Sequence, residues 1–579
     1  MQIQLRDIQS VTPISASGDA LGAGAAGLYG LAASAPTAGS RARGSGMGGR
    51  RKHSCVTAVL LIVAALGGCA SVPPGADYPK HVSVAFVHPE ETKIAQQFAV
   101  AASDHSSASG FRIVTTGTEA FAMRIQLIRA AEHSLDVQYF VFRHDKTGQL
   151  ITEALLKAAD RGVHVRLLID DGARTAEDEP VLALAAHAQI EVRLFNPFAY
   201  RGHGRVIRDA EFLLHVSRLD FRMHNKLLVA DNAAAMIGGR NIGDPYFQMD
   251  PAEQYADDDV FVVGPAVQAL SKTFDEYWNS AFAIPVEALA GGKPKEAALA
   301  EERRQQLGQR QQAQLAMPPY FARAEGDEPL AGILSGQTPV VWSVARVVCD
   351  SPSKKRVADG SMIGRLMYEP VAAATAATNA ELLMITPYFI PTPAEVRLVK
   401  GLSERNVRVR ILTNSLESTN ELSAHSGYVR FRPQLVQDGV ELHEMRALLG
   451  NARGSGQTTA LSRFGNYGLH GKLMVFDRKR LFIGSMNFDQ RSMNLNTEIG
   501  LIIDSPELAE QTAARFEAMT QPVNAYLLIL QPGVDGKPRL VWRTREAGED
   551  VDHEREPSPS EWRRLAVNLL RLLPLDSEL

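Results

Sequence analysis

Two segments far apart in the chain repeat one pattern of polar residues beside an apolar strand. His470 and Lys472 precede the apolar run 473–476, and residues two apart on a strand share a face. His224 and Lys226 have the same spacing before 227–230. An imidazole, a fixed cation and an amide directed into one space suit an anionic phosphoryl group. The polar residues that follow each pair also match in position: Asp231, Gly238 and Asn241 in the first copy, and Asp477, Gly484 and Asn487 in the second.

These two His-x-Lys-x4-Asp motifs resemble the signature of the phospholipase D superfamily. The run His-Asn-Lys from His224, with Gly-Gly-Arg-Asn-Ile-Gly-Asp-Pro-Tyr-Phe ending at Phe247, is similar to bacterial cardiolipin synthases of the C type. The resemblance implies two halves packed about a pseudo-two-fold axis, with one active site shared between them.

Phosphodiester chemistry needs a nucleophile on phosphorus and an acid on the leaving oxygen, and histidine suits both tasks. A lone histidine is most simply structural, but two in matched motifs favour catalysis. By family resemblance His224 is the nucleophile that forms a phosphohistidine, and His470 is the acid. The residues themselves give no physical reason to prefer this order.

The other polar residues of the motifs have separate expected roles. Lys226, Lys472, Asn241 and Asn487 are expected to hold phosphoryl oxygens. Gly239 and Ser485 are expected to bring the backbone close to the phosphate, although tight turns would explain them equally well. Asp231 and Asp477 lie seven residues from their histidines and face the other way on a regular strand, so we expect them to be structural.

Each imidazole also needs an acidic partner. Asp257 and Glu498 occupy matching positions, eight residues before a proline, at the start of apolar strands. This internal alignment predicts that Asp257 and Glu498 orient His224 and His470 through the second ring nitrogen. Asp259 shares the face of Asp257 and is the alternative.

No spacing of histidines, cysteines and acids suggests a metal site, so catalysis without a metal or other cofactor is expected. The three cysteines are Cys55, Cys69 and Cys349, and they form no paired metal-binding pattern. Cys349 is expected to be a plain structural thiol.

Strands and helices alternate upstream of each motif, which predicts an α/β fold with two repeated α-β-α halves and mixed sheets. In the first half strands are expected at 135–140, 163–169 and 190–195 with a helix at 150–161. In the second they are expected at 382–389, 407–412 and 440–445 with a helix at 394–405. The predicted divisions are a leader (1–68), a tether and N-terminal segment (69–110), the first half (111–285), a charged and partly helical connection (286–340), the second half (341–520) and a C-terminal segment (521–579).

The leader has the features of a bacterial lipoprotein signal. Arg50, Arg51 and Lys52 precede a short apolar stretch from Cys55 to Gly68, and the segment ends in a lipobox-like Leu-Gly-Gly-Cys at Cys69. Cys69 is therefore the expected lipidation site, with an uncleaved anchor as the alternative. Met47 is the better start of translation, which would make residues 1–46 spurious. Ala70 favours the outer membrane, with the domain facing the periplasm.

The expected substrate is phospholipid. Residues 562–573 form a basic, Leu-rich amphipathic stretch that fits either a membrane interface or the protein core. The formal net charge of −4 argues mildly against a nucleic-acid partner. The first expectation is phosphatidyl transfer that makes cardiolipin. The alternatives are hydrolysis as a phospholipase D, a nuclease of the same superfamily, or an inactive anchored binding protein.

Overall fold

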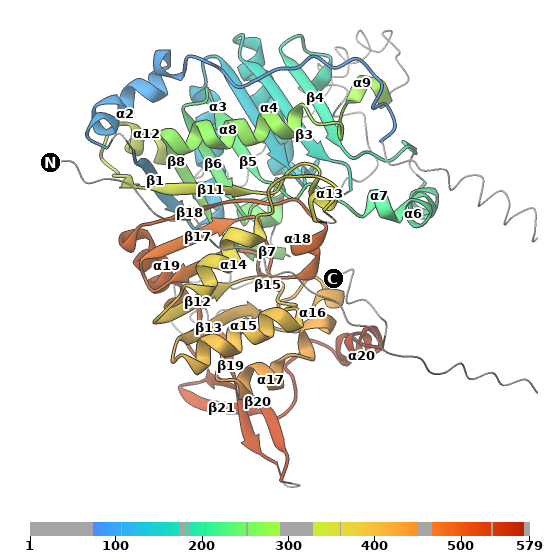
Figure 1. Ribbon diagram of the computed structural model, residues 1–579, viewed down its shortest axis with the longest axis vertical. Helices are drawn as coiled ribbons and strands as arrows, with labels where there is room; N and C mark the ends of the chain where they lie inside the picture. The colour runs from blue at the N-terminus through green and yellow to red at the C-terminus, as the bar shows by residue number, and fades with distance from the viewer. Residues whose placement is uncertain are drawn as a thin grey trace, which may run out of the picture. The chain divides into compact units, whose positions relative to one another are not determined.

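Two mixed β-sheets form the framework of the protein in the computed structural model (Figure 1). The structure describes residues 73–105, 107–172, 181, 184–202, 204–250, 253–289, 308, 328–358, 360–447, 466–533 and 536–572. The leader with Cys69 and most of the charged connection, 290–307 and 309–327, lie outside these residues. Within the described ranges, no helix has the length and apolar character needed to span a bilayer.

The first sheet has nine strands, three of which are parallel neighbours, β2, β3 and β4. In spatial order the strands are β10 (Val341–Ser343), β1 (Ser109–Val114), β8 (Asp259–Val263), β6 (Ala234–Gly238), β5 (Leu227–Ala230), β2 (Ser134–Tyr139), β3 (His164–Asp170), β4 (Ile190–Phe195) and β9 (Ala283–Pro285).

The second sheet repeats this core, with β12, β13 and β14 as its parallel neighbours. Its order is β11 (Ala345–Cys349), β18 (Ile499–Ile503), β17 (Arg480–Gly484), β16 (Leu473–Phe476), β12 (Glu381–Ile385), β13 (Arg408–Asn414), β14 (Glu441–Met445), β19 (Ala525–Pro532), β20 (Pro538–Glu546) and β21 (Glu549–His553).

Helices cover both sheets, and short ones line the connections. The helices of the first half are η1 (Pro89–Glu91), α2 (Lys93–Asp104), α3 (Gly117–Ala130), α4 (Lys146–Asp160), α6 (Arg205–Leu214), α7 (Val216–Leu219), η2 (Asp244–Phe247), α8 (Pro265–Trp278) and α9 (Val286–Leu289). Those that follow are α12 (Pro329–Leu334), α13 (Lys354–Ala358), α14 (Tyr368–Ala376), α15 (Pro393–Glu404), α16 (Leu422–Val429), α17 (Arg432–Gln437), α18 (Gln490–Asn494), α19 (Pro506–Met519) and α20 (Glu561–Leu570).

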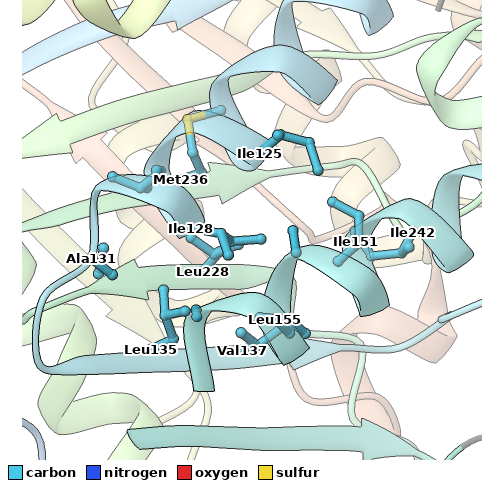
Figure 2. Packing of buried hydrophobic residues seen from close by; sticks show 14 of the residues in the cluster. Ile125, Ile128, Ala131, Leu135, Val137, Ile151, Leu155, Leu228, Met236 and Ile242 are labelled. Atoms are coloured by element: carbon cyan, nitrogen blue, oxygen red, sulfur yellow. The ribbon is translucent and has the colours of Figure 1, made fainter. Parts of the chain in front are cut away.

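Alternation along the strands divides the hydrophobic core into layers. In the first sheet Val137 and Leu228 face α3 and α4, whose Ile128 and Ile151 pack on them (Figure 2). The opposite faces of both sheets meet in one shared cluster that also contains α8 and α19. The outer face of the second sheet packs against α14 and α15. The two halves therefore share buried apolar surface, which holds their facing edges in a defined arrangement.

Side-chain caps explain where the helices of the two halves begin. Asp145 accepts a hydrogen bond from the backbone N–H of Gly148, so α4 begins at Lys146, four residues before the predicted start. Thr392 and Glu395 form a reciprocal capping box at the start of α15, close to the predicted boundary.

Three flanking segments are more closely tied to the halves than their expected divisions suggest. The predicted tether includes Lys80, whose ammonium donates to the carbonyl of Ser280 over 2.9 Å. Strand β10 lies in the expected second half, yet its Ser343 pairs with Ser109 in the first sheet. The C-terminal strands β19 to β21 extend the second sheet beyond β14.

Candidate active site

The two histidine segments are positioned by backbone pairing between the halves. The N–H of His224 donates to the carbonyl of Thr497 over 2.8 Å, next to Glu498. Strand β15 (Asn466–Leu469), which precedes His470, pairs in parallel with β7 (Glu253–Ala256), which precedes Asp257. Each histidine therefore enters the interface beside the segment that carries the other half's carboxylate.

The carboxylate pairing is crossed as a result. His224 Nδ1 lies 2.9 Å from Oε2 of Glu498, and His470 Nδ1 lies 2.6 Å from Oδ2 of Asp257. All four side chains are buried. Asp257 and Glu498 are the predicted residues, but the order read from the internal alignment, with each carboxylate serving the histidine of its own half, was wrong. The reason is the backbone pairing across the halves, which places Asp257 after the strand paired with β15 and Glu498 after the residue paired with His224.

Asp259, the alternative partner, has a different task. Its carboxylate pairs with the guanidinium groups of Arg124 over 2.8 Å and Arg240 over 3.1 Å, all buried. Arg240 also donates to the backbone carbonyl of Asp257. Asp259 therefore fixes the arginines that hold the Asp257 segment, and it does not contact an imidazole.

The two lysines are buried beside their histidines. Lys226 Nζ donates to the carbonyl of His224 over 2.7 Å and lies 5.5 Å from the centre of the Phe140 ring. Lys472 Nζ lies 3.0 Å from His470 Nδ1 and donates to the carbonyl of His470. Burial is the main cause that lowers the pKa of Lys472, to about 8, and it takes the pKa of Lys226 well below its usual value.

Burial and the neighbouring lysine charges lower the pKa of both imidazoles, which favours their neutral forms. Burial and then the charges of Lys226 and Lys472 lower the pKa of His224 well below its usual value. Burial, reinforced by Lys472 and opposed by Asp257, lowers the pKa of His470 to about 3. A neutral imidazole is the form that a nucleophile needs, and a bound phosphodiester anion would favour protonation of its partner.

The pKa values of the two carboxylates are shifted in opposite directions because their surroundings differ. Burial raises the pKa of Glu498 to about 7, against the opposing charge of Lys226. Burial would also raise the pKa of Asp257, but its interaction with His470 and then the charges of Lys472 and Arg240 outweigh it and lower that pKa below its usual value. Asp257 is therefore ionised across the working pH range, whereas Glu498 titrates near neutrality.

Gly239 leaves room for the carboxylate of Asp257, and Ser485 hydrogen-bonds that of Glu498. A methyl group placed on Gly239 would lie 2.1 Å from Oδ1 of Asp257, so only glycine leaves room for that carboxylate. At the matching position the hydroxyl of Ser485 accepts from the N–H of Ile499 and donates to Glu498. These contacts face the carboxylates, and direct contact of either residue with phosphate stays a prediction.

The two asparagines are buried at the ends of their hairpins. Asn241 Oδ1 accepts from the N–H of Val141 over 3.2 Å. Within the described part of the chain, Oδ1 of Asn487 is a buried oxygen without a hydrogen-bond partner. Contact of either amide with phosphoryl oxygens stays a prediction.

The motif aspartates are turned away from the rings. Asp231 and Asp477 are each the first of the two central, positive-φ residues of a turn, which joins β5 to β6 in the first half and β16 to β17 in the second. Their carboxylates accept backbone N–H groups at the starts of β2 and β12: the three residues 132–134 in the first half and 379–381 in the second. These bonds tie the hairpin to the neighbouring strand.

Aromatic side chains that the motif spacing did not reveal surround the rings unequally. Phe140 lies 5.0 Å from His224, edge to face. Tyr246 and Tyr255 lie 5.1 Å and 5.5 Å from His470. Their positions, just after β2, in η2 and in β7, carry no periodic signal. Asp350 was also missed: its carboxylate accepts the N–H of Glu498 and pairs with buried Lys354 over 2.9 Å.

In the described residues, one group of side chains has ligand atoms close enough to hold a metal ion: exposed His88, Glu90 and Glu91 before α2. It lies outside the set of residues that surround the two imidazoles. The candidate site is thus built from two histidines, two lysines and two crossed carboxylates.

This fold and this site define an enzyme of the phospholipase D superfamily. A family model described as "Cardiolipin synthase, PLD-like domain" matches residues 124–278 and 372–520, and the chain belongs to that family. Cardiolipin synthase C of Escherichia coli (strain K12) is 33% identical over 480 residues, which cover 82% of this chain and 97% of that protein.

Two further proteins extend the comparison. An uncharacterized protein of Helicobacter pylori (strain ATCC 700392 / 26695) is 30% identical over 496 residues, covering 84% of this chain and 93% of its own. The crystal structure of phosphatidylserine synthase from Haemophilus influenzae Rd KW20 is 13% identical, with a TM-score of 0.47, and the match covers 75% of this chain and 92% of that one.

Proposed function

We propose that this enzyme is a phosphatidyltransferase that makes cardiolipin from phospholipids through a phosphohistidine. The observation that carries the proposal is the crossed pairing, which holds Nδ1 of each ring and leaves Nε2 for reaction. The relatives named cardiolipin synthase support phospholipid as the substrate.

The reaction proceeds in two displacements at phosphorus. Nε2 of His224 attacks the phosphorus of the donor, and the headgroup oxygen leaves with a proton from His470. The hydroxyl of the acceptor headgroup then loses its proton to His470, and its oxygen displaces His224 from phosphorus. Lys226 and Lys472 offset the charge on the phosphoryl oxygens during both steps.

Hydrolysis is the second candidate, because water can replace the acceptor alcohol at the same phosphohistidine. Purified protein is incubated with labelled phosphatidylglycerol, with and without phosphatidylethanolamine. Labelled cardiolipin supports transfer, whereas phosphatidic acid as the main product in both mixtures supports hydrolysis. No lipid product, together with cleavage of a nucleic-acid substrate, would overturn both.

We also propose that lipidation of Cys69 anchors the protein in the bacterial envelope, facing the periplasm, with the outer membrane as the expected site. Labelling of cells with a radioactive fatty acid would mark the wild-type protein and leave Cys69→Ala unlabelled. Equal labelling of both would refute the anchor.

A further inference from the structure

Helix α6 turns its apolar face to solvent and contacts the protein through polar side chains. Its apolar residues Val206, Ile207, Leu213 and Leu214 are exposed, Val206 to 81%, and Val216 of α7 continues them. Two of its polar residues face inward: Glu211 accepts from the N–H groups of Ala199 and Tyr200, and Arg208 donates to the carbonyl of Asp171. A helix that docks on a protein core shows the opposite arrangement.

Helix α20 in the other half is oriented in the same way. Trp562, Leu565, Leu569 and Leu572 recur at helical spacing and are exposed, Trp562 to 77%. The arginines face the protein: Arg563 donates to the carbonyl of Leu416 over 3.2 Å, and Arg564 to that of Glu556. The helix is docked on the protein, where Val567 is buried and α20 packs against α16, while Trp562, Leu565 and Leu569 face outward.

Both helices are attached close to the two histidines. The guanidinium of Arg208 in α6 donates to the carbonyl of Asp171, next to Asp170, whose carboxylate accepts the N–H of Met223 just before His224.

On the other side, Arg563 also donates to the carbonyl of Thr419. The next residue, Asn420, donates to the hydroxyl of Tyr255, whose ring lies 5.5 Å from His470. Each half thus supports one outward-facing apolar helix within a few contacts of its side of the site.

A third exposed apolar element, the turn after α13, lies between α6 and α20 along the chain, and α13 contacts α7. Lys355 of α13 donates to the carbonyl of Ser217 in α7 over 2.9 Å, and the turn after α13 exposes Met362 and Ile363, the latter completely. Figure 1 shows α6, α7, α13 and α20 along the same margin of the molecule, with α2 at the opposite one.

We propose that α6 with α7, the turn at 362–363 and α20 form a docking surface that rests on a phospholipid bilayer and presents the site to the headgroups. The choice of a bilayer rests on the proposed function. A diacyl lipid leaves a membrane only by exposing every methylene of two chains to water, so the enzyme must come to the surface. Tryptophan at one end of an apolar stripe is typical of interfacial helices.

The test separates binding from catalysis in the full chain carrying Cys69→Ala, which removes any acyl anchor from every sample. The variants are Leu213→Asp/Leu214→Asp in α6 and Leu565→Asp/Leu569→Asp in α20. Val100→Asp is the matched control, because Val100 is 79% exposed on α2. Sedimentation with phosphatidylglycerol–phosphatidylethanolamine vesicles measures binding, and turnover is measured on those vesicles and on a short-chain, water-dispersed phosphatidylglycerol.

Both double variants are expected to lose at least tenfold in vesicle binding and in vesicle turnover, while turnover of the dispersed lipid stays within twofold. The control should retain all three. Trp562 fluorescence should shift to shorter wavelength with vesicles, a change absent in Trp562→Phe.

Unchanged vesicle binding by both double variants would overturn the docking surface. A stable dimer that the double variants dissociate would also overturn it, because a second copy would then cover these helices. If the wild-type protein binds vesicles through this surface but turns over no lipid in either form, the docking surface is supported and the proposed phosphatidyl transfer is refuted.

Discussion

The His224–Glu498 pair and the His470–Asp257 pair occupy matching positions in two repeated halves, yet they are chemically unequal. Glu498 has a pKa of about 7, a serine hydroxyl behind it and Phe140 near its histidine. Asp257 has a lowered pKa, a glycine behind it, and two tyrosines near His470. Duplication supplies two similar imidazoles, and the differing neighbours allow them to do different tasks.

The strongest test of this inequality replaces one histidine at a time. His224→Ala should lose all turnover above background and form no phosphoenzyme. His470→Ala should lose about 10²- to 10⁴-fold with a poor leaving group, the usual worth of general acid catalysis. With an activated aryl ester it should accumulate phosphoenzyme, measured by rapid acid quench. Accumulation in His224→Ala instead would reverse the assignment of roles.

Replacing the carboxylates tests the crossed pairing. Asp257→Asn and Glu498→Gln should each lower kcat about 10- to 100-fold, the range for groups that orient a catalytic imidazole. Asp257→Asn should alter the NMR titration of His470, and Glu498→Gln that of His224. A perturbation confined to the histidine of the same half would contradict the crossed arrangement.

On its acid side, the pH dependence should report Glu498. As the pH falls through about 7, Glu498 gains a proton and no longer stabilises a positive imidazole, so kcat/KM should fall by up to tenfold per pH unit. Asp257 has a lowered pKa and stays ionised, so it adds no second acid limb. Glu498→Gln should flatten this limb while Asp257→Asn preserves it. Equal flattening by both substitutions would show that the pairs are alike.

Substituting Gly239 and Ser485, which lie behind the two carboxylates, tests the inequality of the pairs more finely. Gly239→Ser places a side chain where Asp257 lies, and kcat should fall about tenfold or more with the loss of that orientation. Ser485→Ala removes one hydrogen bond to Glu498, worth about 1 kcal/mol, so kcat should fall about fivefold. A larger loss in Ser485→Ala than in Gly239→Ser would contradict the steric argument.

The smallest effect on catalysis is expected from the motif aspartates. Asp231→Ala and Asp477→Ala each leave backbone N–H groups without an acceptor, so the free energy of unfolding should fall by about 1–3 kcal/mol. The loss should be larger for Asp231, which is fully buried, than for the partly exposed Asp477. Denaturant unfolding measures both, and turnover per folded molecule well below the midpoint should change little. Loss of turnover without loss of stability would give these residues a catalytic role.

Much of the architecture was predictable because local patterns decide it. The predicted strands lie within two residues of the observed ones, since apolar runs bounded by turn residues form strands where they are buried, except that β12 ends at Ile385, four residues before the predicted end. The start of α4 was misjudged because its cap at Asp145 lies outside the apolar periodicity. The outward apolar face of α20 could not be read from spacing, because an amphipathic stripe is the same whether it faces a core or a membrane.

By itself, the sequence determined which residues the candidate site would contain: two histidines, two lysines and two acids in matched positions, carried by two similar α/β halves. Only the tertiary structure decided which acid serves which ring, because that depends on strands pairing across the interface between halves, 213 and 274 residues apart along the chain. It also decided the inequality of the two pairs. Protonation depends on burial and nearby charge, and these arise when distant segments meet.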